Sequence, residues 1–313
     1  MNEHQAGSAE NFNRVYIIGA GAVGAAYASI IYDKDPACIS FIACGERFER
    51  LRRDGVVVNG KTYPIPVQNS EDSYPAADLI IVTVKHHHLD QAIREMKSGV
   101  GTNTLIISLL NGIDSEERIA AVYGEEKILY ATVVGIDALR EGNNVVYTKQ
   151  GKIFFGEKQN FVISKRVRRV ADFFNLMGIV HEIPEDMLRT LWWKFMINVG
   201  INQASAALKG SYGVFQTSPE ARKLMESAMQ EVIALARKLA IDLSDQDIEK
   251  WYTVLATLSP AGKTSMLQDV EAGRKTELEM LAGKVIELGR RHGVPTPVNE
   301  YLFNIIKEIE SSR

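Results

Sequence analysis

The sequence predicts an α/β protein in which a doubly wound sheet is followed by an all-helical domain. Up to about residue 185, short runs of β-branched and apolar residues alternate with helical stretches, a pattern typical of a parallel sheet covered by helices. Beyond that point, long helical stretches follow one another with almost no strand signal. We therefore expect two domains, residues 1–185, in which 1–13 form a loose tail, and residues 186–313.

The first element is a strand that runs directly into a glycine-rich turn. Residues 15–18 are apolar and β-forming, and Gly19, Gly21 and Gly24 follow in the order Gly-x-Gly-x-x-Gly before a small-residue helical pattern. In dinucleotide-binding turns these glycines permit the tight turn, the approach of a pyrophosphate and the close packing of helix on strand. The helix N-terminus would direct its free N–H groups at the phosphates. This context predicts a Rossmann-like doubly wound sheet, with an ordinary strand–helix turn as the alternative.

The remaining strands of the first domain follow as apolar runs separated by helical patterns. Residues 78–84 are almost continuously apolar, which indicates a strand buried on both faces of a parallel sheet. Further strands are expected at residues 39–43, 55–60, 104–110 and 128–134, and helices at residues 47–53, 89–96, 115–122 and 166–177. Residues 144–147 and 152–155 are expected to form an antiparallel pair.

The second domain is predicted to consist of long helices. They are expected at residues 187–207, 218–239, 244–258, 264–292 and 298–309. Thr264 and Ser265 are both natural N-caps for the fourth helix, and the spacing favours Thr264. Glu277 lies among many acidic residues on that predicted helix, so spacing alone predicts a solvated side chain.

One polar face stands out within the apolar stretch from residue 187 to residue 207. Lys194, Asn198 and Asn202 are spaced at i, i+4 and i+8, so they share one side of a helix. Almost everything between them is apolar, and a lysine inside a buried helix is costly unless it is paired or used. Two interpretations stay open: a functional lysine, or a lysine whose stem lies along the helix while its ammonium reaches water.

The residues after the second strand bear on which dinucleotide binds. NAD enzymes usually carry Asp or Glu about 20 residues after the glycines. Here residues 43–45 are Ala-Cys-Gly, and Arg47 follows, with more arginines at positions 50, 52 and 53. The missing acid and the nearby guanidinium groups favour NADPH, because arginine can bind a 2′-phosphate through two hydrogen bonds. The alternative for these arginines is a solvated helix face.

Composition argues against several classes of function. The 313 residues carry a net charge of −3 with no basic footprint, so no nucleic acid or membrane partner is expected. The only two cysteines, Cys38 and Cys44, suit a cytoplasmic protein without disulfides. His86, His87 and His88 are adjacent and cannot all converge on one ion, so a solvated helix start is favoured over a metal site.

Six motifs occur in an order that resembles the ketopantoate reductase (2-dehydropantoate 2-reductase) family. They are the glycine turn, Thr83-Val-Lys85, Asn111-Gly112, Lys194-x-x-x-Asn198-x-x-x-Asn202, Ser265-Met-Leu-Gln-Asp269 and Arg274-Lys-Thr-Glu277. The resemblance covers roughly residues 14–310, and six motifs together are far more specific than any one. It implies a 6-phosphogluconate-dehydrogenase-like fold, in which a Rossmann NADP-binding domain precedes a helical substrate and catalytic domain.

The resemblance also implies an activity and a role for each site residue. Members reduce 2-dehydropantoate (ketopantoate) to (R)-pantoate with NADPH, in pantothenate and coenzyme A biosynthesis. Lys194 would be the general acid that protonates the forming alkoxide, and Glu277 would hold the substrate hydroxyl. The residues that would fix the substrate's carboxylate and oxygens are Asn111, Asn198, Asn202 and Ser265. Those that would bind the cofactor are Gly19, Ala20, Gly21, Ala22, Val23, Gly24, Arg47, Lys85 and Asn111.

Two departures from the family pattern bear on specificity. The family often has an arginine at the position of Cys44, so Arg47 would have to bind the 2′-phosphate, and Leu110 replaces a frequent glutamine. Members that act on other 2-keto acids share the same catalytic set. The alternatives are a related 2-keto acid reductase, an NAD-dependent hydroxyacid dehydrogenase of the same superfamily, and a regulator that senses NADPH without turnover. A small 2-keto acid is the expected substrate, and a homodimer is compatible with the sequence.

Overall fold

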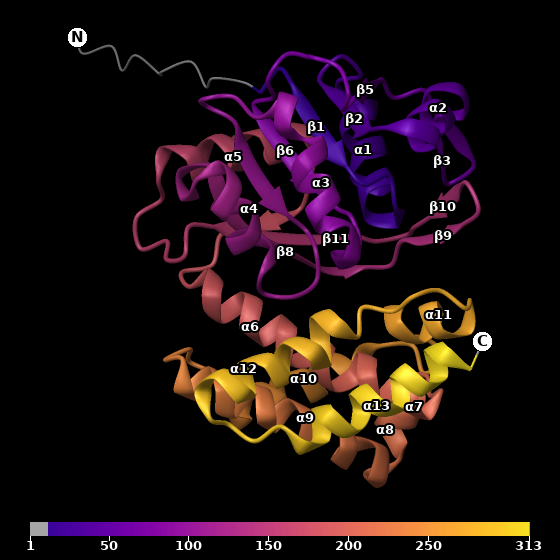
Figure 1. The fold of residues 1–313 in the computed structure, drawn as a ribbon, viewed down its shortest axis with the longest axis vertical. Helices are drawn as coiled ribbons and strands as arrows, with labels where there is room; N and C mark the ends of the chain where they lie inside the picture. Colours follow the sequence, from indigo (N-terminus) through magenta and orange to yellow (C-terminus); the bar gives the residue numbers. More distant parts are fainter. Residues whose placement is uncertain (1–11, 313) are drawn as a thin grey trace. The chain divides into compact units, whose positions relative to one another are not determined.

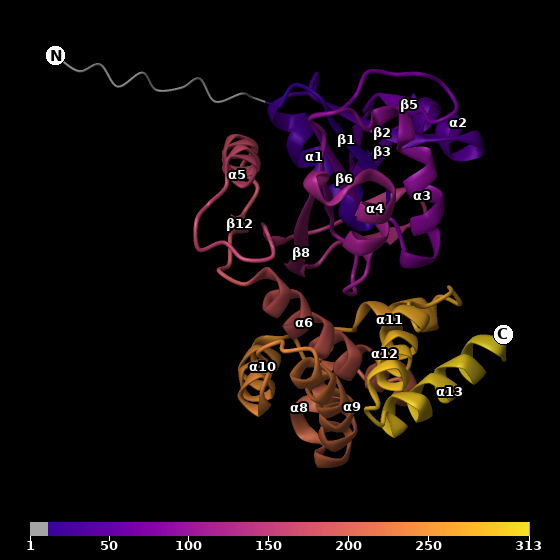
Figure 2. The ribbon, with the colours of Figure 1, turned by 60° about the vertical axis from the view of Figure 1, so that its left-hand side comes forward.

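The computed structural model describes residues 12–312, which form two compact units. Unit 1 contains residues 12–110 and 114–187, and unit 2 contains residues 111–113 and 188–312. Unit 1 carries the sheets, and the described residues of unit 2 contain helices and loops (Figures 1 and 2). The predicted fold class is confirmed. Residues 1–11 of the predicted tail lie outside the described residues.

Unit 1 is built on an eight-stranded sheet in the order β12-β11-β8-β7-β6-β1-β2-β5. Neighbouring strands are parallel except β11 and β8, which are antiparallel. The strands are β1 Val15–Ile18, β2 Ile39–Ala43, β5 Val67–Asn69, β6 Leu79–Val82, β7 Leu105–Ser108, β8 Ile128–Ile136, β11 Gln150–Gly156 and β12 His181–Glu182. The strands predicted at residues 39–43, 78–84, 104–110 and 128–134 are therefore confirmed.

The order of the strands creates a switch point beside β1. From β1 the chain moves to β2 on one side of the sheet and later returns to β6 on the other side, and Ile18 pairs with Val82 in register. Ligands of open α/β sheets bind outside the carboxyl ends of strands at such a point. The glycine turn follows β1, and Thr83 to Lys85 follow β6, so both predicted motifs of unit 1 lie at this end of the sheet.

Helices cover both faces of this sheet, as the side chains of β1 illustrate. Val15 and Ile17 belong to the apolar cluster that includes α1 and α5, whereas Tyr16 and Ile18 belong to the cluster that includes α3 and α4. Alternate residues of a strand point to opposite faces, so a wholly apolar strand can be buried on both. The helices of unit 1 are α1 Ala22–Lys34, α2 Gly45–Asp54, α3 Leu89–Glu95, α4 Ser115–Tyr123 and α5 Lys165–Met177.

A second sheet in unit 1 has four strands in the order β4-β3-β10-β9. Its strands are β3 Val56–Val58, β4 Lys61–Tyr63, β9 Leu139–Glu141 and β10 Asn144–Val146. The strand β10 pairs with β9 and β3, whereas β11 pairs with β8, so the predicted antiparallel pairing of residues 144–147 with 152–155 is wrong. Gly142 takes a φ of 59° in the tight turn after β9, which folds β10 back on the residues that precede it.

Unit 2 packs its helices around α9, whose apolar side is buried along its whole length. Its helical segments are α6 Met187–Ile197, a π-helical segment Asn198–Asn202, α7 Gln203–Leu208, α8 Tyr212–Thr217, α9 Pro219–Lys238, α10 Asp245–Thr257, α11 Ser265–Glu271, a π-helical segment Glu279–Gly283, α12 Lys284–His292 and α13 Pro297–Ser311. The predicted helices at 218–239, 244–258 and 298–309 are confirmed. Within residues 12–312, no helix is both long and apolar enough to span a membrane.

The prediction of one helix over residues 264–292 is wrong, because the chain breaks between α11 and α12. Gly273 takes a φ of 64°, a conformation that favours glycine. Its N–H binds the Val270 carbonyl, and the N–H of Arg274 binds the Asp269 carbonyl. This pair of bonds is the Schellman motif, which ends a helix by satisfying its last carbonyl groups.

Candidate active site

The glycine turn joins β1 to α1 and needs glycine at two of its three positions. Gly19 has a φ of 109°, and a Cβ there would come within 2.7 Å of the Thr83 backbone. A Cβ on Gly24 would come within 2.0 Å of the Gly19 carbonyl oxygen. Thr83 Oγ1 donates a hydrogen bond to that same oxygen (2.7 Å), which ties the turn to the end of β6. Close packing therefore accounts for Gly19 and Gly24.

Gly21 differs from the other two glycines. Its φ is −76°, and the nearest atom to a Cβ placed there is the Thr83 carbonyl oxygen at 4.0 Å. Neither strain nor packing within the described residues demands glycine at this position. The helix α1 begins at the next residue, and no side chain caps its N-terminus. Open space in front of an uncapped helix N-terminus fits the pyrophosphate of a dinucleotide.

Arg47, the predicted 2′-phosphate ligand, lies on α2 just after β2 and is held by a buried acid. Its Nη2 forms an ion pair with Glu95 Oε1 at 2.6 Å, and the Glu95 side chain is only 8% exposed. The same oxygen accepts hydrogen bonds from Cys44 Sγ (3.1 Å) and Gln91 Nε2 (2.6 Å). Glu95 was not identified from the sequence, because 48 residues separate it from Arg47 and its own helix gives no sign of burial.

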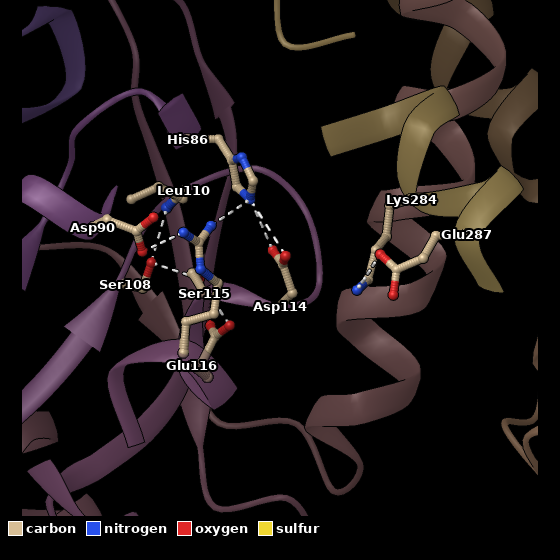
Figure 3. Close-up of polar contacts among 10 residues, drawn as sticks. His86, Asp90, Ser108, Leu110, Asp114, Ser115, Glu116, Lys284 and Glu287 are labelled. Carbon is tan, nitrogen blue, oxygen red and sulfur yellow. Dashed lines mark hydrogen bonds and ion pairs between the residues drawn. The ribbon is translucent and has the colours of Figure 1, made fainter. Parts of the chain in front are cut away.

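Lys85 follows β6 and precedes a short 3₁₀ turn formed by the three consecutive histidines. His86 Nε2 lies 3.1 Å from Asp114 Oδ1, a contact drawn in Figure 3. The same nitrogen lies 3.2 Å from Nη1 of Arg118. His87 and His88 are exposed. No group of three or more His, Cys, Asp or Glu side chains in the described part of the chain could hold a metal ion.

A chain of hydroxyl groups holds the end of β7, just before Asn111. Ser115 Oγ lies 2.8 Å from Ser108 Oγ and 2.9 Å from Glu116 Oε2, and the Leu110 N–H donates to Ser108 Oγ at 3.4 Å (Figure 3). Glu116 is buried, and this burial raises the pKa of its carboxyl to about 7. Glu116 could not be recognised from the sequence, because an acid in the first turn of a helix is normally explained by its favourable interaction with the helix dipole.

In unit 2, hydrogen bonds join three of the predicted site residues. Asn111 Nδ2 donates to Glu277 Oε2 (3.1 Å), and Asn111 Oδ1 accepts from Asn198 Nδ2 (3.3 Å). We call these three residues the Asn111 cluster. They come from residues 111–113, from the break after α11 and from the first π-helical segment. The structure therefore gathers one carboxylate and two amides from distant parts of the sequence.

Glu277 is not solvated, so the prediction from its spacing is wrong. It lies in the break between α11 and α12 and is 8% exposed. The backbone N–H and the hydroxyl of Thr276 both donate to Glu310 Oε1 (2.8 and 2.7 Å), and Leu278 is fully buried. These anchors on both sides fix the Glu277 carboxylate against Asn111.

Lys194, Asn198 and Asn202 lie on consecutive turns of one continuous helical path. Lys194 is half-buried on α6, and the two asparagines begin and end the first π-helical segment. Four residues overshoot an α-helical turn of 3.6 residues but fall short of the wider π turn. The π segment therefore offsets the drift of the α-helix and keeps the three side chains near one side. Such segments occur frequently at functional sites.

Tight packing and buried hydrogen bonds stabilise this π segment. A Cβ on Gly200 would come within 2.5 Å of the Met229 side chain on α9. Gln203 Nε2 donates to Asn299 Oδ1 (3.0 Å), and the fully buried Asn299 donates to Glu231 Oε2 on α9 (2.7 Å). The segment that carries Asn198 and Asn202 is thus locked to the core of unit 2.

Ser265 is the first residue of α11 and its side chain is exposed. Thr264 is the N-cap, since its Oγ1 accepts a hydrogen bond from the Leu267 N–H (3.2 Å). This confirms the capping role favoured for Thr264 and leaves the Ser265 hydroxyl available. None of the hydrogen bonds given for the described residues joins Ser265 to the Asn111 cluster.

Comparison with known families decides the relationship of this chain. The family model "Ketopantoate reductase PanE/ApbA" matches residues 15–160, and the model "Ketopantoate reductase PanE/ApbA C terminal" matches residues 186–310. The chain belongs to the ketopantoate reductase family. The resemblance inferred from the six motifs is confirmed, and with it the assignment to the oxidoreductases.

Relatives of this ketopantoate reductase family member cover nearly its whole length. A 2-dehydropantoate 2-reductase from Aquifex aeolicus is 26% identical over 302 residues, which are 94% of this chain and 96% of the relative. A solved D-mandelate dehydrogenase with NADH and anilino(oxo)acetate has a TM-score of 0.86 at 22% identity, covering 96% of this chain and 99% of that one. A dimeric ketopantoate reductase from Staphylococcus aureus gives a TM-score of 0.76 at 22% identity, with the same coverage. The two structures share the fold.

Proposed function

We propose that this protein reduces 2-dehydropantoate to (R)-pantoate with NADPH, a step of pantothenate and coenzyme A biosynthesis. Family membership and a relative named 2-dehydropantoate 2-reductase along nearly the whole chain support this reaction. The observation that carries the proposal is the hydrogen-bonded Asn111 cluster, whose Asn198 lies one helical turn from Lys194. A cationic donor, a carboxylate and neutral amides are the groups that reduction of a small hydroxylated keto acid requires.

Lys194 is the proposed general acid. Reduction of a ketone develops negative charge on its oxygen, and a positioned ammonium both stabilises that charge and donates the proton that completes the hydroxyl. Lys194 is half-buried among the apolar residues of α6, where a charge interacts more strongly than in water. The ammonium gives up its proton in each turnover and regains one from solvent.

The remaining residues of unit 2 are proposed to orient the substrate. The Glu277 carboxylate, already held by the Asn111 amide, accepts the hydroxyl proton of the substrate in a hydrogen bond. The neutral groups that bind its carboxylate and oxygens are Asn111, Asn198, Asn202 and Ser265. Because amides and hydroxyls carry no net charge, they position a small anion without neutralising the Lys194 ammonium.

Unit 1 is proposed to bind the cofactor, with residues 1–185 as the NADP-binding domain and 186–313 as the substrate domain. When bound, NADPH would supply the hydride. The open space at Gly21 and the uncapped start of α1 fit its pyrophosphate, and Lys85 lies at the same end of the sheet. Arg47 would bind the 2′-phosphate by sharing its guanidinium with Glu95. The other proposed cofactor contacts are Gly19, Ala20, Ala22, Val23, Gly24 and Asn111.

A second candidate is an NAD-dependent 2-hydroxyacid dehydrogenase or a reductase of another 2-keto acid. The structural likeness to D-mandelate dehydrogenase with NADH favours this candidate. A regulator that senses NADPH without turnover would have no use for the Asn111 cluster beside Lys194.

Nicotinamide absorbance separates these candidates. The purified protein is mixed with NADPH or NADH and with 2-dehydropantoate, phenylglyoxylate or 2-ketoisovalerate, and the reverse reaction is followed with the matching hydroxy acids. We expect the highest kcat/KM for 2-dehydropantoate with NADPH. Preferred turnover of phenylglyoxylate with NADH would establish the second candidate, and binding of NADPH without any turnover would establish the regulator.

We also propose a homodimer in the cytoplasm. The Staphylococcus aureus family member of similar fold is described as dimeric. Cys38 and Cys44 are both free thiols, which suits a reducing compartment. Light scattering after size exclusion tests the assembly, and a mass of 34.8 kDa, that of one chain, would contradict the dimer.

A further inference from the structure

Arg140, on β9, lies against the glycine turn, although no motif points to it. Its Nη1 donates a hydrogen bond to the carbonyl oxygen of Ala20, the residue between Gly19 and Gly21. Its Nε donates to the Gly142 carbonyl oxygen at 2.9 Å. The strand pairing of Arg140 with Val145 on β10 fixes the backbone from which this side chain extends. A guanidinium group therefore stands at the turn where a dinucleotide phosphate is expected.

Among the described residues, Arg140 is also a cation without a carboxylate partner. None of the ion pairs given for the described residues includes Arg140 or Arg50, which lies on α2. Burial lowers the pKa of Arg140, and the positive charge of Arg50 lowers it further, so the two guanidinium groups repel each other. A half-buried cation beside a like charge is costly unless an anion compensates it.

Arg47, by contrast, is already compensated. Its ion pair with the buried Glu95 is 2.6 Å long, and the same carboxylate is fixed by Cys44 and Gln91. A phosphate on Arg47 would have to compete with this carboxylate. At Arg140 and Arg50 a phosphate would meet two positive charges. The acid near Arg50 is Asp54, whose carboxylate already pairs with Arg53.

We infer that Arg140, assisted by Arg50, is the principal ligand of the cofactor's 2′-phosphate, and that Arg47, which Glu95 already holds, contributes less. This inference rests on the proposed use of NADPH. In dinucleotide-binding folds the ribose 2′ position lies near the end of the second strand and the glycine turn. Arg50 belongs to the helix that follows β2, and Arg140 touches the glycine turn itself, so together they span this position. Arginine suits the task because its planar fork can bind two phosphate oxygens at once.

Calorimetry with three probes tests the inference without any turnover. NADPH and adenosine 2′,5′-bisphosphate carry the 2′-phosphate, whereas NADH lacks it. We expect Arg140→Met to raise the Kd of the first two by about tenfold to hundredfold, as for loss of a charged hydrogen bond, and to leave NADH within about twofold. Arg50→Met should raise the same two Kd values by a smaller factor. Arg53→Met is the matched control, because Arg53 lies on the same helix, is exposed and pairs with Asp54.

Two results would overturn the assignment. Equal weakening of NADPH and NADH by Arg140→Met would mean a role at the pyrophosphate or in the fold, and unchanged NADPH binding would mean no role. If Arg140→Met does not fold, the Kd values of the three probes are compared for Arg140→Lys and Arg50→Met instead. Arg50 is exposed, so its replacement should leave the fold intact. Unmutated protein that binds both dinucleotides equally would instead refute the proposed NADPH preference, so the two failures are distinguishable.

Discussion

The glycine turn of unit 1 consists of six consecutive residues, whereas the Asn111 cluster of unit 2 draws three side chains from segments up to 166 residues apart. The turn works through its backbone, since Gly19 and Gly24 are needed for close packing and Gly21 leaves open space. The cluster works through side chains that are buried or half-buried and hydrogen-bonded to one another. The first region can be recognised from local sequence, and the second exists only in the folded protein.

The two regions should therefore respond differently to mutation. A substitution in the turn changes either the fold or the space for a ligand, depending on which glycine is replaced. A substitution in or beside the cluster removes one charged or polar group, so the fold can survive while binding or chemistry fails.

The largest effect is expected for Lys194→Met, which keeps the side-chain stem and removes the charge. Loss of a general acid should lower kcat by roughly 10²–10⁴-fold. NADPH affinity should hardly change, and the melting temperature should not fall, because an apolar side chain suits a half-buried site. Steady-state kinetics measures kcat, and calorimetry measures the NADPH affinity and the melting temperature. The control is Lys223→Met, on the exposed side of α9. Near-normal turnover would mean that Lys194 is structural.

In the turn, Gly21→Val and Gly24→Ala should have different effects, the first on NADPH binding and the second on stability. Gly21→Val should raise the NADPH Kd by more than about 100-fold, because the side chain occupies the space in front of the helix N-terminus, while the fold survives. Gly24→Ala should lower the melting temperature, because its Cβ would lie 2.0 Å from the Gly19 carbonyl oxygen. Unchanged NADPH affinity in folded Gly21→Val protein would make the turn an ordinary one.

Glu277→Gln tests the substrate side of the cluster at nearly constant shape. We expect the KM for 2-dehydropantoate to rise by about tenfold to hundredfold, the cost of losing a hydrogen bond to a charged group. A 2-keto acid without the hydroxyl, such as 2-ketoisovalerate, should show little change. Glu279→Gln, two residues away and exposed, is the control. Equal losses for both substrates would assign Glu277 a structural role.

The smallest effect is expected from the hydroxyl chain that ends at Leu110. The pKa of Glu116 is about 7 in the folded protein and 4.5 without burial, so the folded state retains a proton that the unfolded chain releases. Its stabilising contribution is present below pH 4.5 and is lost as the pH rises to about 7. Glu116→Gln resembles the protonated form at every pH. As the pH rises from 4.5 to about 7, the free energy of unfolding of this variant should therefore come to exceed that of the unmutated protein, by up to about 3 kcal/mol.

Denaturant unfolding between pH 4 and pH 8 measures that difference, in steps of about one pH unit. Glu117→Gln is the matched control, because Glu117 is the next residue on the same helix and is exposed. A difference between Glu116→Gln and unmutated protein that does not vary with pH would show that Glu116 ionises normally.

Local pattern was sufficient for most of the individual elements. The strands β1, β2, β6, β7 and β8 could be predicted because a short apolar run between polar turns is typical of a buried strand. The helix that Ser218 caps could also be predicted from residues close together in the sequence. The prediction of one helix over residues 264–292 failed because a glycine that ends a helix lies among residues that favour one. Gly273 lies among good helix formers, yet it ends α11, and this break is what buries Glu277.

The sequence by itself determined the glycine turn, the order of strands and helices, and the motif set that identifies the family. These properties depend on backbone preferences and on residues close together in the chain. Only the tertiary structure decided that Glu277 is buried against Asn111 and that a π segment runs from Asn198 to Asn202. It also decided that Arg47 pairs with Glu95, whereas none of the ion pairs given for residues 12–312 includes Arg140. Burial and charge compensation depend on contacts between residues far apart in sequence, which a single sequence does not encode in any local pattern.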